Sequence, residues 1–322
     1  DPLQAGSNDQ GMASLVERAL ARVEPRLGAD PEVAARVEVG LGRTLANLGR
    51  RESADVAFGR AIAHLAALHG THDERVYALR LQREQQRLKS GEIAPAEQAL
   101  KTLRQNIAAR LGATSPLLLE ADVRLAGARL ERGDFAGCIT LYQALLPRFG
   151  PDTPVLEAES LMDLSLCESR LGHFQAALTH ANASLRLVRD ALGDTHPYTL
   201  ESSIAVENAL VGLGRYEQAV KLLKRLVDAF ERRYGDTHPV TLLAMHDLGF
   251  ALTCGQRADE AVPWLRRAAA GRRQTLGADH PWYALTEGML GTAEIQRGQL
   301  AAAEAALHDA REAFGQRQQA LP

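Results

Sequence analysis

Three histidines come closest, by type and spacing, to a chemical site in this sequence. His196, His238 and His280 each precede a proline, and successive members are 42 residues apart. Imidazole binds metals and transfers protons near neutral pH. A shared metal ion needs its ligands about 2 Å away, whereas equivalent residues of stacked helices lie about 10 Å apart. The spacing therefore predicts a structural role for these histidines, as N-caps of three helices.

No other arrangement of residues indicates catalysis. The sequence lacks a phosphate-binding loop and a nucleophile elbow, and its three cysteines fit no metal pattern. We therefore predict no catalytic residue, no metal site, no cofactor and a protein that is not an enzyme. The adjacent arginines Arg272 and Arg273 are interpreted as part of a solvated helix face.

The composition favours helices and argues against two classes of partner. Of the 322 residues, 46% are hydrophobic and only 5% aromatic, which suits close packing of helices better than a sheet. The formal net charge is −3, and the basic residues are scattered, so we expect no nucleic-acid binding through this region. Without a run of about 18 apolar residues, we expect no membrane insertion.

The histidines belong to a longer repeat. Gly-Asp-Thr-His-Pro at 193–197 recurs at 235–239, and Gly-Ala-Asp-His-Pro follows at 277–281. A second series of glycine turns alternates with these segments, so each period contains two helices. We predict a flexible segment 1–12, a helical array 13–314 and a tail 315–322. Within the array, we expect a capping helix 13–27 and seven helix pairs starting near residues 31, 73, 115, 154, 197, 239 and 281.

The best copies of the unit resemble the tetratricopeptide repeat (TPR) family. The motif residues are Leu248-Gly249 in the first helix, Gly214-Arg215-Tyr216 at the turn, and Ala219 three residues later. The 42-residue length is similar to the long subtype of kinesin light chains. The resemblance implies an all-α, right-handed superhelical solenoid, whose concave groove is lined by the first helix of each pair.

The start of the array resembles a particular group of bacterial proteins. Asp30-Pro31 and Leu41-Gly42-Arg43-Thr44 are similar to the repeat regions of membrane-anchored Ser/Thr kinases and winged-helix transcription regulators. The resemblance implies a sensor region in signal transduction or transcription regulation, placed either in the periplasm or in the cytoplasm. Because the chain starts with Asp1 rather than Met, we expect it to be part of a longer protein.

Aligning the first helices predicts a binding surface in repeats four to six. Apolar residues stand where peptide-binding relatives often have Asn, which favours an amphipathic partner helix with basic flanks over an extended peptide. Two alternatives remain open: a receptor for a peptide pheromone or small molecule, or side chains that only fill contacts between repeats. The predicted partner-binding residues are Glu159, Met162, Glu201, Ile204, Asn208, Val211, His246 and Phe250.

The first helix of the second repeat departs from the pattern. Between Tyr77 and Lys89 the sequence is rich in Arg, Gln and Glu, although a face of this helix should join the core. The sequence alone provides no physical reason for this polarity.

Overall fold

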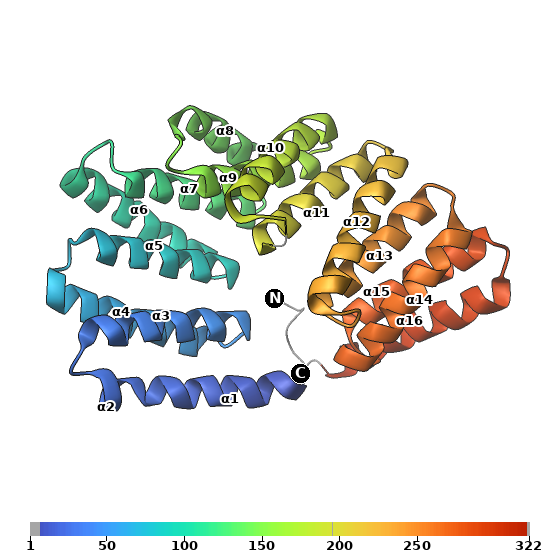
Figure 1. The fold of residues 1–322 in the computed structure, drawn as a ribbon, viewed down its shortest axis with the longest axis horizontal. Coiled ribbons are helices and arrows are strands. Elements are labelled where there is room, and N and C mark those ends of the chain that lie inside the picture. Colours follow the sequence, from blue (N-terminus) through green and yellow to red (C-terminus); the bar gives the residue numbers. More distant parts are fainter. Residues whose placement is uncertain (1–6, 195, 321–322) are drawn as a thin grey trace. The chain divides into compact units, whose positions relative to one another are not determined.

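The computed structural model describes residues 7–194 and 196–320, and these residues form helices joined by short turns (Figure 1). The predicted all-α fold class, built from consecutive helix pairs, is therefore confirmed. The chain forms two compact units, 1–156 and 157–322, and the boundary between them falls within one helix. Among the described helices, none is both long and apolar enough to cross a membrane.

The first unit contains an N-terminal helical segment and three helix pairs. Its third pair is shortened: α8 has 11 residues, whereas α6 has 19. Pro147 follows in a short 3₁₀ helix, η1, and its missing N–H cannot continue the α-helical ladder. The elements are α1 Ser7–Ala21, α2 Val23–Leu27, α3 Pro31–Asn47, α4 Arg51–His69, α5 Glu74–Lys89, α6 Ile93–Leu111, α7 Pro116–Glu131, α8 Phe135–Leu145 and η1 Leu146–Arg148.

The N-terminal helix differs from the predicted one. It starts at Ser7 instead of residue 13, so residues 7–12 are helical, while residues 1–6 of the predicted flexible segment lie outside the described residues. The helix ends at Ala21 and a second short helix follows. Ser14 and Glu17 have the spacing of a capping box, but Ser14 lies inside the helix and Glu17 accepts a hydrogen bond from Ser53 Oγ at 2.8 Å. Glu17 therefore connects α1 to α4.

The second unit contains the most regular pairs. The last helix continues to Ala320, so the predicted tail from residue 315 is helical as far as that residue. Fully buried alanines, such as Ala219 and Ala261, let the two helices of a pair approach closely. The elements are α9 Pro154–Arg170, which crosses the unit boundary, α10 Phe174–Leu192, α11 Pro197–Gly212, α12 Tyr216–Tyr234, α13 Pro239–Cys254, α14 Ala258–Leu276, α15 Pro281–Gln296 and α16 Leu300–Ala320.

The His-Pro histidines are N-caps, as predicted. Nδ1 of His196, His238 and His280 accepts the backbone N–H two residues later, at 3.2, 3.4 and 3.2 Å, respectively. Proline occupies the first turn after each of them. Each ring thus satisfies one of the backbone donors that a helix start leaves unpaired.

Replacing the three capping histidines with alanine should destabilise the fold modestly. Loss of a cap costs about 0.5–2 kcal/mol, and these N–H···N bonds are long, so we expect about 0.5 kcal/mol per site. The triple Asn variant should stay close to wild type, because Asn caps helices well. Urea unfolding of both triple variants measures the difference. Equal stability of the Ala and Asn variants would mean that the caps contribute nothing.

Candidate functional site

The eight predicted residues, here called the candidate surface, lie on the first helices of three consecutive pairs. Glu201 and Asn208 are exposed, and the other six side chains are half-buried. Apolar area therefore remains accessible next to polar groups, but a role in binding stays a prediction. Glu159 and Met162 lie on α9, Glu201, Ile204, Asn208 and Val211 on α11, and His246 and Phe250 on α13.

His246 differs electrostatically from the rest of the candidate surface. Its Nδ1 is buried and has no hydrogen-bond partner among the described residues. Burial, together with the positive charge of Arg272, lowers the pKa of His246 to about 3. The ring is therefore neutral at physiological pH and would offer a partner a polarisable surface, not a positive charge.

Arg272 is buried, which corrects its interpretation as part of a solvated face. Only 2% of the residue is exposed. Its Nη1 donates to the Trp282 carbonyl at 2.9 Å and to Thr286 Oγ1 at 2.5 Å, and the guanidinium lies 5.3 Å from the Trp282 ring centroid. The sequence did contain a signal for this burial. Arg272 lies on the same face of the helix as the buried residues Leu265 and Ala268.

Two carboxyl groups in the second unit, Glu207 and Asp247, influence each other electrostatically, and Asp247 also interacts with the charge of Arg272. Burial raises the pKa of Asp247, and Arg272 opposes part of that rise. Burial, followed by the charge of Asp247, also raises the pKa of Glu207. Neither carboxyl group stands out in the sequence, since each lies in an otherwise ordinary helical segment. These carboxyl groups lie on α11 and α13, two of the helices that carry the candidate surface.

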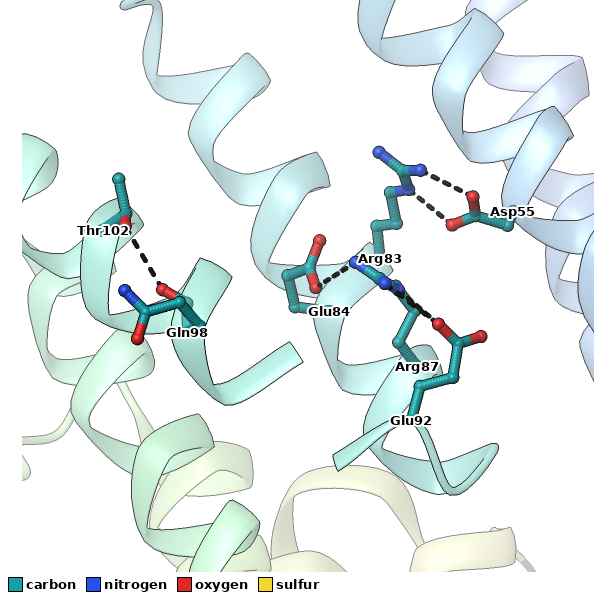
Figure 2. A network of polar contacts seen from close by, with 7 residues as sticks. All are labelled: Asp55, Arg83, Glu84, Arg87, Glu92, Gln98 and Thr102. Carbon is teal, nitrogen blue, oxygen red and sulfur yellow. Dashed lines mark hydrogen bonds and ion pairs between the residues drawn. The ribbon is translucent and has the colours of Figure 1, made fainter. Parts of the chain in front are cut away.

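The polarity of α5 has a structural explanation, shown in Figure 2. Arg83 donates two hydrogen bonds of 2.6 Å to the carboxylate of Asp55 on α4. Arg87 donates to buried Glu84 at 3.1 Å and to Glu92, which precedes α6, at 3.1 and 2.9 Å. The Arg83 hydrogen bonds hold the pKa of Asp55 below its usual range. The polar residues of α5 thus join it to neighbouring helices.

A family comparison identifies the repeat type. The model described as "Tetratricopeptide repeat" matches residues 156–232, 208–273 and 241–316. Together these matches extend over half of the chain. A comparison with curated proteins finds no match.

Solved structures with the same fold include RapI, a quorum sensor and kinesin-light-chain-like repeats. Apo RapI has a TM-score of 0.68 at 13% identity, over 88% of this chain and 77% of RapI. The apo quorum sensor NprR from B. thuringiensis has a TM-score of 0.65 at 14% identity, over 94% and 82% of the two chains. Kinesin-light-chain-like repeats from Podosopora anserina have a TM-score of 0.54 at 22% identity, over 62% and 96%. At these low sequence identities, the similarity shows a shared fold only.

Proposed function

The chain belongs to the tetratricopeptide repeat family, and from this we propose that it binds a peptide or protein segment through the candidate surface. In this proposal it is the partner-binding sensor region of a larger bacterial signalling or regulatory protein, and it has no catalytic activity. The preferred partner is an amphipathic helix with basic residues at its ends.

The accessibility of apolar side chains on consecutive first helices supports this proposal most directly. Met162, Ile204 and Phe250 are only half-buried and lie on α9, α11 and α13. Burying apolar area against a partner contributes about 25 cal/mol per Å². Exposed Glu201 lies on the same helix as Ile204 and would attract a basic flank.

A solved relative with a bound factor supports the alternative of a receptor for a small peptide or molecule. A Rap protein with the same fold has been solved in complex with Competence and Sporulation Factor, at a TM-score of 0.60 and 12% identity. In this alternative, the same surface would recognise a free ligand instead of a segment of a protein. The ligand would then raise the melting temperature by mass action.

Charge reversal at Glu159 and Glu201 should weaken binding of a basic-flanked helix. The probes are two amphipathic helical peptides with a leucine face, one flanked by lysines and one by glutamates. Fluorescence anisotropy should show that wild type prefers the lysine-flanked peptide. The double variant Glu159→Lys, Glu201→Lys should lose about threefold to tenfold in affinity, in line with exposed charge pairs of 0.2–1 kcal/mol each. Its binding should also depend less on salt.

Ile204→Asp should weaken binding of both peptides, because it places a charge in the apolar contact. The matched control is Asp228→Lys with Glu304→Lys, two exposed residues of second helices. Circular dichroism checks that every variant is folded. Unchanged affinity in both surface variants, with intact folding, would exclude this surface as the binding site.

A further inference from the structure

Three potential metal ligands meet in the first unit. They are Glu24 on α2, Glu38 on α3 and His64 on α4. Nε2 of His64 lies 3.1 Å from Glu24 Oε2 and 3.6 Å from Glu38 Oε2. One donor atom from each of the three residues fits within 4.8 Å of the other two.

Glu38 is the reason to regard this group as more than an ion pair. The residue is 0% exposed, and neither carboxylate oxygen has a hydrogen-bond partner among the described residues. Burial raises the pKa of this carboxyl, although His64 and Arg60 oppose the rise. A buried carboxylate without hydrogen bonds is costly, and the contact with His64 at 3.6 Å is too long to supply one.

We propose that Glu24, Glu38 and His64 bind a zinc ion, with water as the fourth ligand. Zinc takes nitrogen and oxygen ligands at about 2.0–2.2 Å in a tetrahedral arrangement, which puts neighbouring donor atoms about 3.3–3.5 Å apart. The distances from His64 Nε2 to the carboxylate oxygens of Glu24 and Glu38, 3.1 and 3.6 Å, lie just below and just above this range. Imidazole with carboxylates suits zinc better than magnesium or calcium, which prefer oxygen ligands alone.

Charge and access agree with this assignment. Two carboxylates balance the charge of a divalent ion, and the ion would coordinate a carboxylate of Glu38 that makes no hydrogen bond among the described residues. The side chain of Glu24 is 60% exposed and that of His64 is 18% exposed, so an ion can enter from solvent through Glu24. Bound zinc would connect α2 to the first helix pair and stabilise the N-terminal end of the array.

A metal site at these residues was not predictable from the sequence, because the ligands follow no metal motif. They are 14 and 26 residues apart, and each comes from a different helix. Only the packing of α2 against α3 and α4 brings them together.

Zinc titration of the chelator-treated full chain tests the proposal. Calorimetry should show one zinc ion per chain, and zinc should raise the melting temperature by several degrees through preferential binding to the folded state. Cobalt, used as a spectroscopic probe of the same site, should give the intense visible absorption of a tetrahedral complex. Magnesium should have no effect at the same concentration.

Glu38→Gln is the decisive variant, because it keeps the size of the side chain and removes its charge. It should fold as well as wild type and bind zinc at least about tenfold more weakly. This estimate is a minimum, because residues that only hydrogen-bond to metal ligands already change metal affinity by about 10- to 100-fold. His64→Ala should lose the cobalt absorption. The control is His308→Ala, since exposed His308 also has a nearby carboxylate, Glu312 at 3.8 Å, and should not affect zinc binding. Failure of wild type to bind zinc, or equal affinity in Glu38→Gln, would overturn the proposal.

Discussion

Gly249→Val is expected to lower the free energy of unfolding by about 3 kcal/mol, at the upper end of overpacking costs. Gly249 lies inside α13 and is buried. A Cβ atom there would lie 2.4 Å from Leu265 Cγ and 2.6 Å from its Cδ2. Leu265 is 0% exposed on α14, so it has no space into which to move. The two helices of this pair would have to separate.

Gly288→Ala is the matched control, with an effect of opposite sign. Gly288 also lies inside a first helix, α15, but an added Cβ would meet no described atom within 4 Å outside its own helix. Alanine favours helices over glycine by up to about 1 kcal/mol, so this variant should be slightly more stable than wild type. Urea unfolding measures both effects. A Gly249→Val protein as stable as Gly288→Ala would contradict the close approach of α13 and α14.

The fold could be predicted because its signals are local and periodic. The glycine and His-Pro segments recur at a fixed distance, and the caps at His196, His238 and His280 follow from backbone chemistry alone. The ends of the array were less predictable. Ser14 and Glu17 fitted a helix start by spacing, but a hydrogen bond from Ser53 gives Glu17 another role.

The roles of the buried and half-buried polar residues could not be predicted, because they depend on contacts between different helices. Arg272 looked exposed beside Arg273, yet it is held by a carbonyl and a hydroxyl of α15. The polarity of α5 made sense only when Asp55 and Glu92 were seen to bind its arginines. A spacing rule finds residues on one helix face, but it does not show which face of another helix they meet.

The second large effect concerns pH and the buried carboxyl group of Glu207. This residue is 3% exposed on α11. Burial, and then the negative charge of Asp247, raise the pKa of Glu207 to about 8. The charge of Arg272 acts on Asp247. Burial, and then the charge of Glu207, raise the pKa of the nearby Cys254 thiol. Glu207 is therefore protonated in the folded protein at neutral pH.

The direction of the pH effect follows from this raised pKa. The folded state binds the Glu207 proton more tightly than the unfolded state, in which the pKa is about 4.3. The contribution to stability is complete below that value and is lost as pH rises to about 8. His246 has the opposite effect, because its pKa is lowered to about 3, but its contribution changes only below about pH 6.5. Between pH 6.5 and 8, His246 adds almost no slope.

Glu207→Gln should therefore remove much of the stability loss between pH 6.5 and 8. One proton corresponds to about 1.4 kcal/mol per pH unit, so wild type should lose about 1–2 kcal/mol more than the variant over this interval. At roughly 2–4 °C per kcal/mol for 150–250 residues, melting curves at the two pH values resolve this difference. The control Glu304→Gln changes an exposed carboxylate of α16 and should retain the wild-type slope. Asp247 is coupled to Glu207, and its pKa is raised to about 7, so the difference between wild type and Glu207→Gln measures the pair of carboxyl groups. The titrating groups that do not interact with Glu207 are common to all three proteins, and their effects cancel in the comparison. Parallel pH dependence of wild type and Glu207→Gln would show that Glu207 ionises equally easily in the folded and unfolded chain.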